Sequence, residues 1–394
     1  MTSLKEVLEK YEPVVGIEIH AQLKTESKAY CGDKNEYGHL PNTLTSPVSL
    51  GHPGTLPIFN RKVIDHAVKL GIACDCDITK EMHFDRKNYF YADLPKGYQI
   101  TQDKTPVCRG GNITIRLKNG NEKNIELTRI HMEEDSGKSI HDLDPLNTLI
   151  DLNRAGVPLL EIVTEPVIKS AEEAYQYVTE IRKLLRYLDI CDGNMEEGSM
   201  RCDVNISIME KGSETFGQRV EVKNLNSIRS VQRSIDYEIL RHAELLEKKG
   251  VVSVETRTFD APSGKTIAMR KKEAAHDYRY FPEPDLNPIK IEASFIKKTK
   301  ESMPPLPNEL FKKFTNEYQL SSYDALVIIE QKEIALYYEK IVSQTNNYKS
   351  AANWVMGGIK SFLNHQAISI LSFEVSAEKI AQLIKLIDDN LISH

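Results

Sequence analysis

The sequence predicts an α+β fold, with a first domain built on an antiparallel sheet and a small all-α domain after it. Strand-like and helical segments are interleaved in the first part, and short turns join its neighbouring strands. After residue 305 the hydrophobic spacing is helical almost throughout, and strand signals nearly vanish. A chain of 394 residues also exceeds the usual size of one domain, so we expect two or three.

The strands are identified by strict alternation of apolar and polar residues. The first is predicted at residues 14–23, with one wholly apolar face. Residues 112–132 predict a hairpin that turns at Asn119-Gly120, a pair typical of tight hairpin turns. Residues 201–223 predict a second hairpin, with one apolar and one densely charged face.

The helices are identified by capping residues and by a period of three to four residues. Ser170 to Glu173 has the pattern of a capping box and begins one helix. Another is predicted from about residue 227 to 249, ended by Gly250. Four more are expected in the last part, at residues 306–318, 322–345, 349–364 and 376–391.

A change in composition gives the domain boundary. Arginine occurs up to Arg279 and never after it. A proline-rich stretch over residues 280–307 crosses this change and is typical of an extended connector. We therefore expect a first domain of residues 1–294 and a helical domain of residues 295–394.

The composition excludes several classes of protein. With 51 Lys plus Arg against 57 Asp plus Glu, the net charge of -6 argues against a general nucleic-acid coat. No apolar run approaches the roughly 20 residues of a membrane span, and the N-terminus lacks the apolar core of a signal peptide, so we expect a cytoplasmic protein. The six cysteines form no Cys-x-x-Cys pair, and no complete phosphate-binding loop is present.

Acidic residues on strands are the most informative candidates for chemistry. Glu18 and His20 lie two apart on an otherwise apolar strand, so both project to one side, where they could share a cation. Glu133, Glu134 and Asp135 are three consecutive carboxylates, which repel one another unless a cation lies among them.

The second predicted hairpin and the residues just before it carry further charged side chains. Glu196, Arg201, Asp203 and Lys223 could form an exposed ladder of ion pairs, or the floor of a cleft that binds ATP and Mg²⁺. Each of the other two features also has an alternative. The face with Glu18 and His20 could simply be exposed to solvent, and the three consecutive carboxylates could form a solvated acidic turn. The repetition of carboxylates beside bases on three strands favours the cleft.

Two segments mix aromatic rings with cations, at residues 84–100 and 276–285. Such a mixture suits a single-stranded RNA end, whose bases stack on rings while its phosphates meet cations. A packed aromatic loop is the alternative.

These motifs closely resemble the B subunits of the bacterial and organellar tRNA-dependent amidotransferases, the GatB family. Eight segments in the same order carry the resemblance, over nearly the whole chain: 15–23, 84–91, 93–100, 131–138, 153–163, 193–199, 221–227 and 276–285.

The resemblance implies a ligase that forms carbon–nitrogen bonds with glutamine as amido donor. With ATP and Mg²⁺, such a protein would phosphorylate the side-chain carboxylate of Glu-tRNA(Gln) or Asp-tRNA(Asn), and ammonia would displace the phosphate. Ammonia would arrive through a channel from the A subunit, which is the glutaminase. The small C subunit would complete a heterotrimer that serves protein biosynthesis. The catalytic domain of the family is a cradle that resembles glutamine synthetase.

Residue roles follow from the resemblance position by position. It implies Glu18, His20 and Glu133 as metal ligands, and Glu134 as a catalytic residue close to them. Contacts to phosphate or substrate are expected from Glu196, Arg201, Asp203 and Lys223.

The sequence departs from the family at two places. Where many members carry four cysteine ligands of zinc, this chain has Cys31-Gly-Asp33 and Ser46-Pro-Val-Ser49, so one ligand of four survives and zinc is not expected. Members of the family usually continue into a further domain that binds tRNA, which we expect to be absent here.

A free-standing amide ligase and a non-catalytic RNA-binding module remain alternative functions.

Overall fold

The structure is a computed structural model that describes residues 3–269 and 278–393. The chain divides into two compact units, Met1–Met303 and Pro304–His394. The sequence placed the boundary near residue 294, within the first turn of the helix α5 (Ala293–Glu301). That helix belongs to the first unit, because it packs on α2 (Arg61–Ala73).

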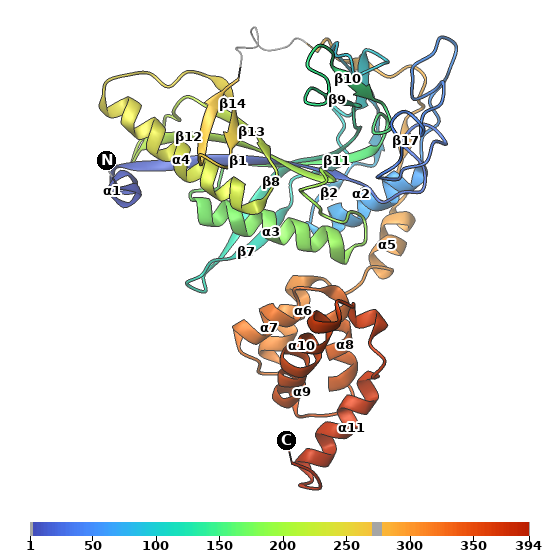
Figure 1. Ribbon diagram of the computed structural model, residues 1–394, viewed down its shortest axis with the longest axis vertical. Coiled ribbons are helices and arrows are strands. Elements are labelled where there is room, and N and C mark those ends of the chain that lie inside the picture. The colour runs from blue at the N-terminus through green and yellow to red at the C-terminus, as the bar shows by residue number, and fades with distance from the viewer. Residues whose placement is uncertain (1–2, 270–277, 394) are drawn as a thin grey trace. The chain divides into compact units, whose positions relative to one another are not determined.

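A large mixed sheet forms the centre of the first unit (Figure 1). Within the described part of the chain it has ten strands in the order β15-β14-β13-β12-β1-β11-β8-β6-β2, with β7 paired to β8. Their bounds are β1 (Tyr11–Gln22), β2 (Asp77–Ile78), β6 (Cys108–Arg109), β7 (Asn112–Arg116), β8 (Glu122–Glu134), β11 (Pro158–Thr164), β12 (Met200–Glu210), β13 (Val220–Leu225), β14 (Glu255–Asp260) and β15 (Lys265–Ala268).

Both predicted hairpins are present. β7 and β8 pair antiparallel around a turn at Asn119-Gly120, where Gly120 has the positive φ of +85° that glycine adopts without strain. β12 and β13 form the second hairpin. The prediction of an α+β fold is confirmed at the level of a mixed α/β molecule with this large sheet.

One strand pair departs from the predicted antiparallel sheet. β13 and β14 are parallel, because the 20-residue helix α4 (Ile228–Glu247) carries the chain back before β14 begins. The other pairs in this sheet are antiparallel.

Helices cover one face of the sheet and leave the other for polar side chains. In Figure 1, α4 and α3 (Ala171–Tyr187) lie along one side, and the hairpin of β9 (Lys138–Ile140) and β10 (Leu149–Asp151) rises on the opposite side. On β1 Ile17 and Ile19 are buried, whereas the alternate residues Glu18 and His20 are partly exposed. The alternation along this strand therefore predicted the two faces correctly.

The start of α3 and the end of α4 differ in detail from their predictions. Ser170 caps α3 by accepting from the backbone N–H of Glu173, but the Glu173 carboxylate accepts from the N–H of Lys169 and not from that of Ser170. At the end of α4 the left-handed residue is Lys249, with φ 57°, and the following Gly250 donates to the carbonyl of Leu245.

The cap of α3 gives a testable effect on stability. We expect Ser170→Ala to lower the free energy of unfolding by about 1 kcal/mol, because the N–H of Glu173 loses its acceptor at 3.1 Å. Urea denaturation measures the change. Ser170→Asp is the control, since an aspartate also caps helices; an equal loss in both variants would contradict the assignment.

The proline-rich stretch, predicted as an extended connector, pairs with strands of the first unit at two places. β16 (Phe281–Pro282) pairs with β4 (Asp85–Asn88), which also pairs with β5 (Tyr98–Thr101). β17 (Ile289–Lys290) pairs with β3 (Glu81–Met82). A bidentate ion pair between Arg86 and the buried Glu283 fastens the segment to the first unit.

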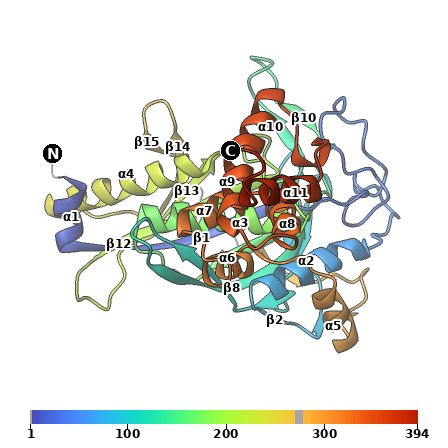
Figure 2. The ribbon, with the colours of Figure 1, turned by 90° about the horizontal axis from the view of Figure 1, so that it is seen from below.

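The second unit is helical, as predicted, but two expected helices are interrupted (Figure 2). Residues 322–345 form two helices because the chain turns at Ile329–Gln331, which lets both bury their apolar faces. Residues 349–364 contain a π-helical turn, Val355–Ile359. The helices are α6 (Pro307–Asn316), α7 (Ser322–Ile328), α8 (Lys332–Val342), α9 (Tyr348–Trp354), α10 (Lys360–Gln366) and α11 (Ala377–Asp388).

The short helix α1 (Leu4–Lys10) precedes β1. Among the helices in residues 3–269 and 278–393, none combines the length and the apolar character that crossing a membrane requires.

Candidate active site

A row of charged residues crosses four neighbouring strands on the face that the helices leave free. In the antiparallel register His131 of β8 lies opposite Glu161 of β11, Glu161 lies opposite His20 of β1, and His20 lies opposite Arg201 of β12. Residues directly opposite in antiparallel strands project to the same side. The register therefore gathers residues that are far apart in the sequence.

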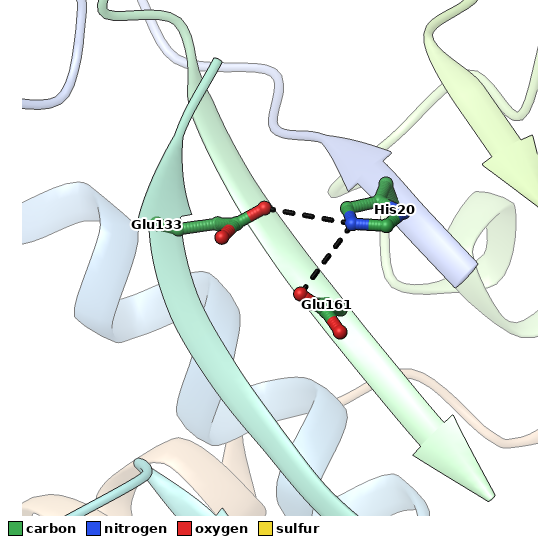
Figure 3. A group of neighbouring side chains, drawn as sticks. All are labelled: His20, Glu133 and Glu161. Carbon is green, nitrogen blue, oxygen red and sulfur yellow. Dashed lines mark ion pairs between the residues drawn. The ribbon is translucent and has the colours of Figure 1, made fainter. Parts of the chain in front are cut away.

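His20, Glu133 and Glu161 form the first group of potential cation ligands (Figure 3). The Nε2 atom of His20 lies 3.6 Å from Oε1 of Glu133 and 3.4 Å from Oε2 of Glu161. His131 approaches the same carboxylates, with its Nε2 atom 3.1 Å from Oε2 of Glu161. Glu133 and His131 are each only 3% exposed, so water screens these charges weakly.

The charges of this group shift its proton affinities. Burial disfavours the charged form of both imidazoles, but the carboxylates of Glu161 and Glu133 outweigh it and raise the pKa of His20 and, to about 9, that of His131. Burial likewise opposes ionisation of Glu161, yet His131 and His20 hold its pKa well below the usual range. The carboxylates thus favour the protonated form of both imidazoles, and the imidazoles favour the ionised form of Glu161.

Glu18, Asp203 and Glu221 form a second group of potential ligands, on β1, β12 and β13. Lys223 bridges two of them, with its Nζ atom 2.8 Å from Asp203 and 2.9 Å from Glu221. Although burial lowers it, the pKa of Lys223 is raised well above its usual value by these two carboxylates. The pKa of Glu18 is raised by burial and by the charge of Glu161.

A cavity of about 530 Å³ opens beside both groups. Arg201 lines it and is held by Asp135, with Nη2 and Oδ2 3.0 Å apart. Gln22 also donates to Asp135, at 2.9 Å. Cations and carboxylates thus face the same space, with Lys87 at its wall. Such a cavity can hold a polyanion together with a divalent cation.

Five of the eight sequence-predicted residues line this cavity, and a sixth, Glu18, belongs to a ligand group beside it. His20, Glu133, Arg201, Asp203 and Lys223 line it. His20 and Glu133 belong to the first ligand group, and Glu18 belongs to the second.

Glu134 and Glu196 lie elsewhere. Glu134 projects to the opposite face of β8, where it pairs with Lys96 and accepts from the N–H of Ile100 at 2.9 Å. It lines a different cavity, of about 100 Å³. Glu196 is exposed and does not belong to the lining of the larger cavity. The alternation of side chains along a strand explains why consecutive Glu133 and Glu134 separate.

The strongest residue that the sequence analysis missed is Glu161, which joins both histidines. A signal existed, because Glu161 is the one charged residue in the apolar strand β11, just as Glu18 and His20 interrupt β1. Asp135 and Glu221 were visible in charged motifs, but nothing local distinguished them from solvated carboxylates.

The two aromatic segments come together beside the cavity. Phe281 lies opposite Arg86 in the pairing of β16 with β4. The guanidinium of Arg86 lies 4.1 Å from the ring centre of Tyr98, and the ammonium of Lys87 lies 4.9 Å from that of Tyr278. His276 and Asp277, which begin the second motif, lie outside the described residues.

A polar cluster occupies the positions where many members of the family carry zinc ligands and where this chain keeps only Cys31. The Asp33 carboxylate accepts from the N–H of Ser46 at 2.9 Å and from the hydroxyl of Ser49 at 2.6 Å. Burial raises the pKa of Cys31 to about 11, which disfavours the thiolate that zinc requires. Hydrogen bonds hold the two segments together here.

Comparison with known proteins identifies the family of this chain. The family described as GatB/GatE catalytic domain matches residues 13–297, and the GatB domain matches residues 336–394. The B subunit of the aspartyl/glutamyl-tRNA(Asn/Gln) amidotransferase of Nitrosococcus oceani is 51% identical over 98% of this chain and 81% of the relative. Proteins of the same name from Chlorobium phaeobacteroides and Clostridium botulinum are 48% and 45% identical, over 97% and 98% of this chain and 80% of each relative. The chain therefore belongs to the GatB family, that of the B subunits of the tRNA-dependent amidotransferases.

Proposed function

We propose that this protein is the kinase and transamidase subunit of a tRNA-dependent amidotransferase. It uses ATP to phosphorylate the side-chain carboxylate of Glu-tRNA(Gln), Asp-tRNA(Asn) or both, and ammonia then displaces the phosphate to give Gln-tRNA(Gln) or Asn-tRNA(Asn). The overall reaction is that of a ligase that forms carbon–nitrogen bonds with glutamine as amido donor.

The observation that carries the proposal is the charge distribution around the cavity of about 530 Å³. A carboxylate is a poor acyl donor, so one oxygen must leave as phosphate. Transfer of a phosphoryl group needs cations around the charged oxygens. Arg201 and Lys223 face this cavity from adjacent strands and supply such cations.

The second group of ligands fits Mg²⁺. Glu18, Asp203 and Glu221 offer three carboxylate oxygens within 4.8 Å of one another, and Mg²⁺ prefers oxygen. When bound, Mg²⁺ would neutralise phosphate oxygens of ATP. The first group contains the imidazole nitrogen of His20, a less suitable ligand for Mg²⁺, and we retain His20 and Glu133 as candidate ligands of a second cation.

The protein's own side chains have separable roles in this proposal. Arg201, oriented by Asp135, binds phosphate oxygens. Attack by ammonia on the acyl phosphate leaves a positively charged nitrogen that must lose a proton. Glu133 borders the cavity at 3% exposure and is the candidate acceptor of that proton.

The partners follow from the same proposal. We place the protein in a cytoplasmic heterotrimer with the A subunit, which is the glutaminase, and with the small C subunit. The rings and cations of β4, β5 and β16 are suited to the unstacked 3′ end of the charged tRNA. An antiparallel array with a carboxylate-lined face also supports the proposed likeness to glutamine synthetase.

The test is ATP hydrolysis by the full chain in complex with its partner subunits. We expect release of ADP with Mg²⁺ and Glu-tRNA(Gln) or Asp-tRNA(Asn), and none with the uncharged tRNAs. Comparing the two charged tRNAs defines the substrate preference.

Two outcomes would overturn the proposal. Equal ADP release with free glutamate and no tRNA would identify a free-standing amide ligase. Binding of charged tRNA without any ADP release or metal dependence would identify a non-catalytic RNA-binding module.

A further inference from the structure

Strand β13 contains one extra residue next to the cavity. Val222 lies opposite Val204, but Leu225 lies opposite Cys202, so three steps along β13 match two steps along β12. Lys223 and Asn224 therefore share the single partner Asp203. An inserted residue of this kind is a β-bulge, a feature that frequently re-aims side chains near active sites.

The bulge changes the face of β13 to which the side chains after Lys223 project. In a regular strand Lys223 and Leu225, two residues apart, would project to the same face. Here Leu225 is 3% exposed and lies opposite the buried Cys202, whereas the ammonium of Lys223 contacts Asp203 at 2.8 Å. Both Leu225 and Lys223 border the cavity. The extra residue shifts the alternation between them, so that Leu225 lies opposite the buried Cys202 while Lys223 stays beside Asp203.

Asn224 provides the backbone geometry of the bulge. Its φ is 60°, in the left-handed region that asparagine and glycine tolerate better than other residues. Its side-chain amide donates to the hydroxyl of Thr258 on β14 at 2.9 Å. Thr256, on the same strand, donates to the carboxylate of Glu221 at 2.9 Å, so β14 supports the bulged strand at two points.

We propose that Asn224 is a positioning residue, whose left-handed backbone holds the ammonium of Lys223 between Asp203 and Glu221. This proposal rests on the proposed function only for its kinetic consequence. The positioning itself is a matter of geometry: a side chain that resists positive φ flattens the bulge and moves Lys223, Leu225 or both from their places.

The experiment compares Asn224→Gly with Asn224→Ala in the complete amidotransferase complex. Both variants lose the bond to Thr258, and they differ only by a Cβ that disfavours positive φ. We expect Asn224→Ala to lower kcat for ADP release roughly tenfold with little change in KM for charged tRNA, and Asn224→Gly to stay within about threefold of the original protein. Thr258→Val removes the same hydrogen bond while leaving residue 224 intact, and we expect it to behave as Asn224→Gly does.

A double-mutant cycle shows whether the effect passes through Lys223. In a Lys223→Met background the difference in kcat between Ala and Gly at position 224 should disappear. A general loss of structure would instead persist in that background, and it would contradict the proposal. Equal kcat for Asn224→Ala and Asn224→Gly in the presence of Lys223 would also contradict it.

Crystal structures of the two variants provide a measurement that needs no activity. We expect the Lys223 ammonium within hydrogen-bonding distance of Asp203 in Asn224→Gly and displaced from it in Asn224→Ala. An unchanged Lys223 in both would overturn the proposal, even if the original protein proved not to hydrolyse ATP. Absence of ATP hydrolysis together with the expected displacement would refute the proposed function alone.

Discussion

Replacement of Glu18 or His20 by alanine is expected to abolish ATP-dependent amidation while leaving the protein folded. Glu18 contributes a carboxylate oxygen to the second ligand group, and His20 joins Glu133 and Glu161 in the first. Removing one preorganised electrostatic partner at such a site costs roughly a hundredfold to a thousandfold in rate. Release of ADP in the complete complex with charged tRNA measures the effect, and circular dichroism verifies the fold.

Glu12→Gln is the matched control for Glu18. Glu12 lies on the same strand, but its carboxylate pairs with Lys169 outside the two ligand groups. We expect this variant to keep its activity. Full activity in Glu18→Ala would refute the metal assignment, and full activity in His20→Ala would remove the first group from the mechanism.

Glu238→Gln is expected to lower the free energy of unfolding by about 3 kcal/mol or more at neutral pH. The Glu238 carboxylate is fully buried between α4 and the sheet, and its Oε2 atom lies 2.7 Å from Nη2 of Arg241 and 3.0 Å from Nε2 of His242. Its Oε1 atom lies 3.3 Å from Nε of Arg257, on β14. A neutral amide at this position leaves Glu255 as the carboxylate that still pairs with both guanidinium groups, so one of two counter-charges is lost.

The stabilisation that Glu238 provides is also expected to depend on pH. Burial would raise the pKa of Glu238, but its contact with His242 and the hydrogen bonds from Arg241 and Thr266 lower it from 4.5 to about 2. A carboxyl group whose pKa is lower in the folded state stabilises it above the unfolded pKa and loses this contribution as pH falls through the folded pKa. The difference in stability between the original protein and Glu238→Gln should therefore shrink between about pH 4.5 and about pH 2.

Glu244→Gln, on the same helix, is the control. Glu244 is exposed and pairs with Lys248, so its neutralisation should leave the urea midpoint unchanged. A loss in Glu238→Gln that does not diminish in acid would show that packing, and not the charge of Glu238, stabilises this region.

Much of the fold could be predicted because its signals are local. The alternation on β1 separates Ile17 and Ile19 from Glu18 and His20, and a strand allows no other division of these residues between two faces. Asn119-Gly120 likewise indicates its hairpin without reference to the rest of the chain. The parallel pairing of β14 was not predictable in this way, because it depends on where α4 delivers the chain.

The candidate site likewise combines features that local sequence predicts with features that depend on distant segments. The sequence by itself determined that β1, β8 and β12 carry carboxylates toward the polar face, although it missed β11, and its long motifs identified the family. Only the tertiary structure decided that Glu161 joins His20 and His131, that Glu18 belongs with Asp203 and Glu221, and that Glu134 lies on the other face of β8. The physical reason is strand register: alternation along one strand is encoded locally, whereas a neighbour across strands depends on a pairing between distant segments, which one extra residue at Asn224 can shift.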